Sequence, residues 1–181
     1  MKDIFICPRN NVVDLTKKHD VTHIVSITDP HGKRPFFHPT RTIWDNILRL
    51  QFEDVIEPTD LHAPTLDHMK QILSWGRKLP ADAIVLVHCE AGISRSTAAA
   101  FALICQRDGP EKLTEAVKLL LEKRACACPN PIMTRHADML LGFGGKLFAA
   151  AEDVANNRIN QYIRNWSPAL QNLVGIKSVR K

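Results

Sequence analysis

Short apolar runs alternate with amphipathic segments along the first half of the chain. Four apolar runs have the length and composition of β-strands, at residues 2–7, 23–27, 46–52 and 83–87. The last of these is continuous, which is typical of a central strand buried on both faces of a sheet. Apolar residues at helical spacing predict helices over residues 12–19, 65–79, 96–107 and 111–123. Asn10 or Asn11 is expected to cap the first of them.

The second half of the chain is predicted to be helical. After Pro129 and Pro131, amphipathic patterns predict helices over 133–141 and roughly 146–166, separated by the glycine-rich residues 142–145. The apolar face of the last helix is expected to dock onto the domain; its residues are Leu147, Phe148, Ala151, Val154, Ala155, Ile159, Tyr162 and Ile163.

The order of these elements predicts the fold class. Strands alternate with helices early and helices dominate late, which favours an α/β fold with a mostly parallel central sheet flanked by helices. We expect a single domain over residues 1–166, with a helical C-terminal part from about residue 131 and a basic tail at 167–181.

Composition and charge narrow the function classes. The chain is 45% hydrophobic and 24% charged with a net charge of +5, so anionic ligands are favoured, but the charge is too scattered to predict a nucleic-acid partner. The apolar runs are too short to span a membrane or to act as a signal peptide. Five cysteines without a CxxC pair argue against a disulfide framework and a zinc site. We therefore expect a cytoplasmic protein without metal or cofactor.

The segment VLVHCEAGISRSTAAA, residues 85–100, carries the candidate chemistry. Cys89 ends an apolar strand, and Arg95 opens the next helix. The amides of the loop between them can turn inward to bind an anion, and Gly92 can take the positive φ that such a curled loop needs. The helix dipole and this ring of amides favour an ionised thiol, while Arg95 offers a planar fork that matches two phosphate oxygens. The sequence thus predicts a phosphate site with a nucleophilic sulfur beneath it.

Residues 88–96, HCEAGISRS, resemble the HCxxGxxR[ST] signature of the cysteine-dependent protein tyrosine phosphatase superfamily, and most of all its small dual-specificity branch. The resemblance implies a phosphotyrosine phosphatase-like fold. It also implies metal-independent hydrolysis of phosphotyrosine, with phosphoserine and phosphothreonine as further candidates, through a cysteinyl-phosphate intermediate.

The same resemblance implies a role for each residue of the signature. Cys89 attacks phosphorus, Arg95 holds two of its oxygens, and Ser96 offers its hydroxyl to the departing sulfur. His88 supports the loop from behind. The residues that line the bound phosphate are Glu90, Ala91, Gly92, Ile93, Ser94 and Arg95.

A general acid is also implied, on a loop some thirty residues before the cysteine. That loop here is EDVIEPTD, residues 53–60, and Asp54 matches best because it lies just past a predicted strand. Asp60 is the second candidate and Glu57 the third. The Trp-Pro-Asp acid loop of the longer receptor-type members is absent from this chain.

Two other functions stay open at this point. A phosphatase-like module could bind phosphoproteins without turnover, or an enzyme could act on RNA 5′ phosphates or phosphoinositides. The loop has no lysine, which disfavours a highly anionic lipid headgroup, so a phosphorylated protein or peptide is the expected partner.

Residues 31–38 and Arg41 are expected either to border the cleft or to form a solvated basic loop. Cys126 and Cys128 are expected to be small buried residues, with a redox pair as the alternative.

Overall fold

A computed structural model describes residues 1–30 and 46–164, and the side chains of the last helix as far as Asn157. It contains a sheet of four strands: β1 (Asp3–Pro8), β2 (His23–Thr28), β3 (Ile47–Gln51) and β4 (Ile84–Cys89). The strand order is β1-β4-β2-β3, and every neighbouring pair is parallel. The predicted parallel sheet is therefore confirmed, with the continuous apolar run of β4 in an interior position.

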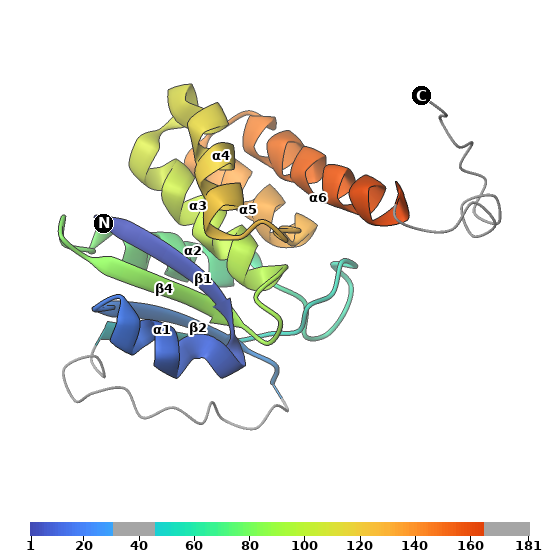
Figure 1. Ribbon diagram of the computed structural model, residues 1–181. Helices are drawn as coiled ribbons and strands as arrows, with labels where there is room; N and C mark the ends of the chain where they lie inside the picture. Colours follow the sequence, from blue (N-terminus) through green and yellow to red (C-terminus); the bar gives the residue numbers. More distant parts are fainter. Residues whose placement is uncertain (31–45, 165–181) are drawn as a thin grey trace.

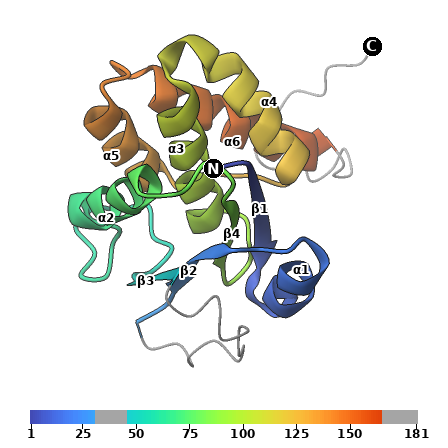
Figure 2. The same ribbon diagram turned by 90° about the vertical axis from the view of Figure 1, so that its left-hand side faces the viewer.

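Helices cover the two faces of this sheet unequally (Figures 1 and 2). One face carries α1 (Val12–Lys18), while the other carries α2 (Leu66–Arg77), α3 (Arg95–Asp108), α4 (Leu113–Lys123), α5 (Pro131–Leu141) and α6 (Lys146–Arg164). Short 3₁₀ turns precede α1 and α4, at Arg9–Asn11 and Pro110–Lys112. In the part of the chain described, no helix combines the length and hydropathy needed to cross a membrane.

The side chains of β4 divide between two cores because successive residues of a strand point to opposite faces. Val85, Val87 and Cys89 belong to the large core beneath α3, whereas Leu86 packs with the small cluster under α1. Helix α3 contacts α2, α4, α5 and the sheet, and its residues from Arg95 to Cys105 are all buried. A helix surrounded on all sides needs small residues, and its alanines allow this close packing.

The N-cap of α1 and the start of α5 differ from the expectation. Asn11 occupies the N-cap position of α1, but its side chain makes no capping hydrogen bond among the described residues. Helix α5 begins at Pro131 rather than at Met133, so assigning that proline to the loop was wrong. Proline fits the first helical position, and the Oδ1 atom of Asn130 caps the helix by accepting from the amides of Ile132 (3.1 Å) and Met133 (3.2 Å).

Two expected segments fall outside this description. They are most of the loop predicted at 28–42, with the basic residues that it contains, and the tail at 167–181. The side chains of Ile159, Tyr162 and Ile163, expected on the apolar face of α6, also lie outside it.

A buried carboxylate fixes the start of α6 to α5. Asp138, 6% exposed, accepts hydrogen bonds from the amides of Gly145 (2.7 Å), Leu147 (2.8 Å) and Phe148 (3.1 Å). These amides belong to the first turn of α6 and the residue before it, where helix amides lack partners within the helix and the dipole favours a negative charge.

We expect Asp138→Ala to lower the free energy of unfolding by about 1–3 kcal/mol, because it leaves these amides without an acceptor in a buried position. Urea denaturation measures this loss. The matched control is Glu152→Ala, an exposed acidic residue on α6, which should change stability by less than about 0.5 kcal/mol. Equal losses in the two variants would contradict the capping role.

Candidate active site

The carboxyl ends of the parallel strands meet at one edge of the sheet, which is where ligands bind in open α/β folds. Strand β4 ends there at Cys89, β2 is followed by Asp29, and β3 is followed by Phe52 and Asp54. The loop that leads from β4 into α3 lies at the same edge (Figure 1). The topology therefore gathers three loops from distant parts of the sequence around Cys89.

The carbonyl groups of the loop after Cys89 all bind to the surrounding protein. The backbone oxygens from Glu90 to Ser94 accept hydrogen bonds, in order, from Arg9 N (3.2 Å), Arg124 Nη2 (3.3 Å), Arg124 Nε (2.8 Å), Cys128 N (2.9 Å) and Ala98 N (2.9 Å). By contrast, the amides of residues 90–94 find no acceptor within the described chain. Five neighbouring amides without acceptors form a concave donor surface suited to an anion.

Gly92 allows this loop to press against β1. Its φ is +67°, and a Cβ atom there would lie 2.4 Å from the carbonyl carbon of Cys7 and from the nitrogen of Pro8. Both the backbone conformation and the space exclude a side chain. The predicted positive φ of Gly92 is confirmed.

Cys89 and Ser96 face each other beneath the loop. The Cys89 side chain is buried, and its Sγ atom lies 3.2 Å from Ser96 Oγ, within hydrogen-bonding range for sulfur. The preceding residue, His88, is fully buried, and this burial lowers its pKa to about 4. His88 is therefore neutral at physiological pH, which suits structural support rather than proton transfer.

Arg95 is 3% exposed and makes its contacts through one end of the guanidinium group. Its Nη1 atom donates to the carboxylate Oδ1 of Asp29 at 2.5 Å and to the carbonyl oxygen of Phe52 at 2.6 Å. Its Nε atom lies 3.8 Å from Oδ2 of Asp54, which is an ion pair without a hydrogen bond. The guanidinium thus stands between the ends of β2 and β3.

Asp54 is held in place by two donors. Its Oδ1 atom accepts from Ser94 Oγ (2.5 Å) and from Asn130 Nδ2 (3.0 Å), while Oδ2 faces Arg95. The same Asn130 amide also donates to the carbonyl oxygen of Val55 at 2.9 Å. Asn130, which is fully buried, therefore joins the loop after β3 to the start of α5.

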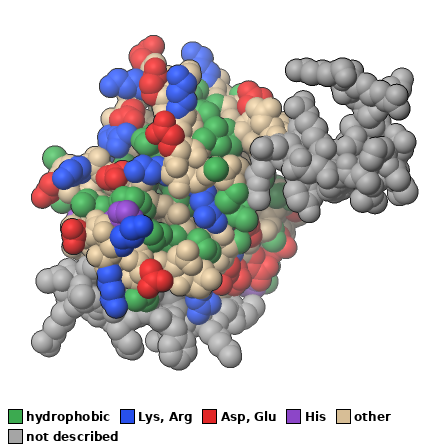
Figure 3. Space-filling model, in the orientation of Figure 1, with side chains coloured by type: hydrophobic (Ala, Val, Ile, Leu, Met, Phe, Trp, Pro, Cys, Tyr) green, Lys and Arg blue, Asp and Glu red, His purple; other side chains and the backbone are tan. Residues whose placement is uncertain are grey.

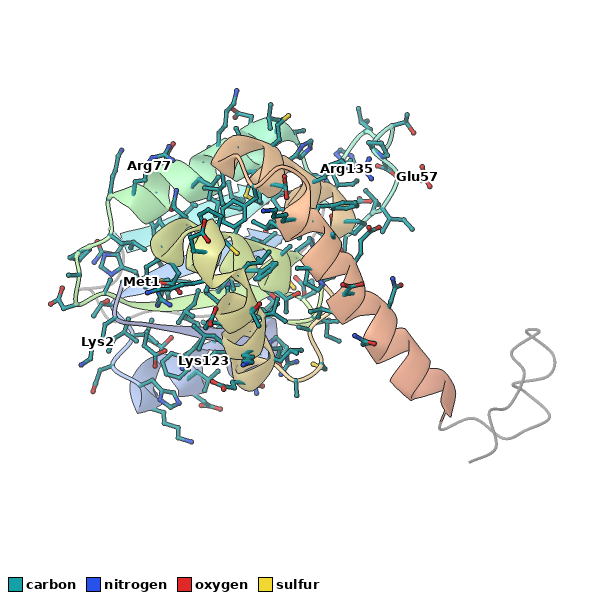
Figure 4. The ribbon with its side chains drawn as sticks, turned by 90° about the horizontal axis from the view of Figure 1, so that it is seen from above. Met1, Lys2, Glu57, Arg77, Lys123 and Arg135 are labelled. Atoms are coloured by element: carbon teal, nitrogen blue, oxygen red, sulfur yellow. The ribbon has the colours of Figure 1, made fainter. Side chains whose placement is uncertain are left out.

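Within the described residues, neither of the other two acid candidates makes a hydrogen bond or ion pair with the signature loop. Asp60 accepts from the amide of His62 at 3.0 Å and so stabilises a turn within its own loop. Figure 4 shows Glu57 at the projecting end of this loop, and Figure 3 shows acidic side chains gathered on that side of the molecule. Of the three candidates, Asp54 is the one that the fold brings beside Arg95.

The structure also places Glu90 and the two cysteines that follow α4. Glu90 turns toward Arg9 and forms an ion pair with it at 3.1 Å, so its charge is partly neutralised.

Cys126 and Cys128 are half-buried rather than buried, and the expectation of two small buried residues was wrong. They belong to the non-helical segment after α4 and stand on either side of Ala127, which is buried. Residues 31–38 and Arg41 lie outside the described residues.

Sequence reasoning missed three residues that shape the site: Asp29, Arg124 and Asn130. Asp29 directly follows a predicted parallel strand, which was a usable signal because such strands end at one edge. Asn130 before Pro131 is a recognisable N-cap signal. Arg124 carried no local signal.

Within the described residues, no cluster of three or more histidine, cysteine or acidic side chains could hold a metal ion.

The amino-acid sequence of the chain is similar to those of known proteins. Residues 4–139 match a family model described as the dual specificity phosphatase catalytic domain. The chain is 30% identical over 128 residues to a Mus musculus protein named dual specificity protein phosphatase 19, covering 66% of this chain and 49% of that protein. The chain thus spans about half the length of this curated relative.

Solved structures show the same fold. DUSP15 is similar with a TM-score of 0.59 at 22% identity, covering 84% of this chain and 92% of that one. The Yvh1 phosphatase domain from Chaetomium thermophilum has a TM-score of 0.54 at 27% identity, with 80% and 93% covered. The human tyrosine phosphatase-like serine/threonine/tyrosine-interacting protein has a TM-score of 0.59 at 22% identity, with 80% and 99% covered.

The lowered pKa of His88 predicts a pH-dependent stability. Between the ordinary value of 6.5 and about 4, the unfolded chain binds a proton at this residue and the folded chain does not. His88 therefore costs no stability above pH 6.5, and its destabilising effect grows as the pH falls toward 4, to about 3 kcal/mol. Urea denaturation across this range should show a steeper loss for the wild type than for His88→Asn.

His23, His68 and His136 also have pKa values that burial lowers, so they too make the stability depend on pH. Their contributions are the same in the wild type and in His88→Asn, so they cancel when the two stability profiles are compared. Parallel stability profiles for wild type and variant would show that His88 is protonated as readily in the folded chain as in the unfolded one.

Proposed function

The chain belongs to the dual-specificity phosphatase catalytic-domain family, which is a class of cysteine-based phosphatases, and on this premise we propose that it dephosphorylates phosphotyrosine in proteins or peptides. Phosphoserine and phosphothreonine are further candidate substrates. The observation that carries the proposal is the ring of amides without acceptors above Cys89, closed on one side by Arg95.

In the first step, the Cys89 thiolate attacks phosphorus, so that a sulfur–phosphorus bond forms and the ester oxygen–phosphorus bond breaks. The loop amides and Arg95 bind the non-bridging oxygens, where charge is concentrated. Asp54 donates a proton to the leaving oxygen. Because its Oδ1 atom already accepts two hydrogen bonds, the proton belongs on Oδ2, the oxygen that faces Arg95.

In the second step, a water molecule attacks phosphorus and gives its proton to the Asp54 carboxylate. The sulfur–phosphorus bond breaks and inorganic phosphate leaves. Ser96, at 3.2 Å from Sγ, donates its hydroxyl hydrogen bond to the sulfur as negative charge returns to it. The thiolate is thereby restored for the next cycle.

The charge around the loop supports a monoester carrying a single phosphoryl group. No lysine lies between Cys89 and Arg95, and Glu90 is paired with Arg9. Phosphoinositides and RNA 5′ ends carry additional phosphates that this loop offers no cation to bind. A phosphorylated protein or peptide is therefore the proposed partner.

The proposal extends to the rest of the chain. Residues 1–166 form one catalytic domain, followed by the basic tail at 167–181. No metal ion, cofactor or membrane takes part. The cytoplasm is the proposed compartment, because all five cysteines are free thiols, as is usual in a reducing environment.

We expect the wild-type protein to hydrolyse p-nitrophenyl phosphate and a phosphotyrosine peptide in the presence of EDTA, and Cys89→Ser to lower kcat at least about 10³-fold because it removes the nucleophile. The Cys89→Ser protein should still bind the peptide in calorimetry. Cys126→Ser, which changes a half-buried thiol outside the loop, is the control and should keep full activity. Wild-type protein that binds the peptide without turnover would support the binding-module alternative instead.

Asp54→Asn should depress kcat most for substrates with poor leaving groups, since these need protonation. For phosphoserine the loss should reach about 10²–10⁴-fold, and for p-nitrophenyl phosphate it should be much smaller. The carboxamide oxygen still accepts from Ser94 and Asn130, so the loop keeps its position. Asp60→Asn is the matched comparison; a larger leaving-group effect in that variant would transfer the acid role to Asp60.

A further inference from the structure

The catalytic guanidinium is anchored at one nitrogen only. The Nη1 atom of Arg95 has two hydrogens, and its two acceptors, Asp29 Oδ1 at 2.5 Å and the Phe52 carbonyl oxygen at 2.6 Å, account for both. Among the described residues, neither Nε nor Nη2 makes a hydrogen bond, and Nε is buried. The edge formed by Nε and Nη2 is thus the part of the group without partners.

That edge is the one a phosphoryl group can use. The Nε and Nη2 atoms carry two parallel N–H bonds, a spacing that matches two oxygens of one phosphate. The alternative edge, between Nη1 and Nη2, is blocked because Nη1 is already engaged. Which edge faces the substrate is therefore decided by what binds Nη1.

Sheet register brings both acceptors to this position. Thr28 of β2 pairs with Gln51 of β3, and the next residues along the two parallel strands are Asp29 and Phe52. The amide of Phe52 donates to the carbonyl oxygen of Thr28 at 3.1 Å, which keeps the strand ends together. The Phe52 acceptor is a backbone atom, whereas the Asp29 acceptor depends on the side chain at that position.

We propose that Asp29 is a positioning residue for catalysis: by binding Nη1 of Arg95 it turns the Nε–Nη2 edge toward the substrate phosphate. This inference rests on the proposed function and assigns a role to a residue outside the signature loop. Among the described residues, Asp29 also supplies the nearest counter-charge to Arg95, since Asp54 lies farther away at 3.8 Å from Nε. Its side chain is 42% exposed, so it acts from the rim of the site.

Two substitutions separate the hydrogen bond from the charge. Asp29→Ala removes both, while Asp29→Asn removes the charge and keeps an oxygen that can accept from Nη1. We expect Asp29→Ala to lower kcat on a phosphotyrosine peptide about 10- to 100-fold through misorientation of the guanidinium. Asp29→Asn should stay within about 3-fold of wild type. Asp14→Ala, an exposed aspartate on α1, is the control for loss of one negative charge.

Vanadate binding, measured by calorimetry, provides a readout that does not need turnover. Asp29→Ala should weaken vanadate binding about 10-fold, and Asp29→Asn should restore it. In an Arg95→Lys background, Asp29→Ala should add less than about 3-fold to the loss, because the partner through which it acts is gone. A merely structural role for Asp29 would give the same additional loss in both backgrounds.

Either of two results would overturn the proposal: an Asp29→Ala protein within 2-fold of wild type in both assays, or an Asp29→Asn protein as impaired as Asp29→Ala. Melting temperatures verify that each variant is folded, and Asp29→Ser repeats the test should the alanine variant be unstable. Wild-type protein that turns over no phosphopeptide would instead contradict the proposed function, and the vanadate measurements would still compare the Asp29 variants.

Discussion

The site depends on how the backbone of residues 90–94 is held. Amides of a loop can face an anion only if the carbonyl groups of the adjoining peptide planes point away and find partners elsewhere, because each peptide plane is rigid. Here the carbonyls of residues 90–94 all bind to groups outside the loop, from the 3₁₀ turn after β1, from α3 or from the segment after α4. The proposed phosphate-binding surface is therefore a product of tertiary structure, although the residues that form it are contiguous in sequence.

A second constraint is the burial of a charged group. Arg95 is almost completely enclosed, and a buried cation needs partners to offset the loss of hydration. Parallel strands provide them, because β2, β3 and β4 all end at the same edge and contribute Asp29, the Phe52 carbonyl and the helix start at Arg95. The same arrangement places Asp54 close enough for an electrostatic attraction to the guanidinium, although the two groups form no hydrogen bond.

How far the sequence predicted this site depends on the range of each interaction. Cys89, Gly92 and Arg95 could be recognised because their roles follow from a strand, a tight loop and a helix start within a few residues. Asp54 was identified through a family resemblance and its place after a strand. Asp29, Arg124 and Asn130 escaped prediction because their partners lie at least 32 residues away, and strand order or loop packing decides such contacts. Periodicity found the strands and helices, whereas the start of α5 required the capping contacts of Asn130.

The position of Arg124 and Asn130 has a consequence for the extent of the functional unit. A fragment ending at Gly109 would contain every residue of the signature and the acid loop. It would nevertheless lack Arg124, which donates hydrogen bonds to the carbonyl oxygens of Ala91 and Gly92. It would also lack Asn130, which is one of the two hydrogen-bond donors to Asp54. The shortest stretch of chain that keeps the proposed phosphate site intact therefore reaches at least to Asn130 at the start of α5, well past Arg95.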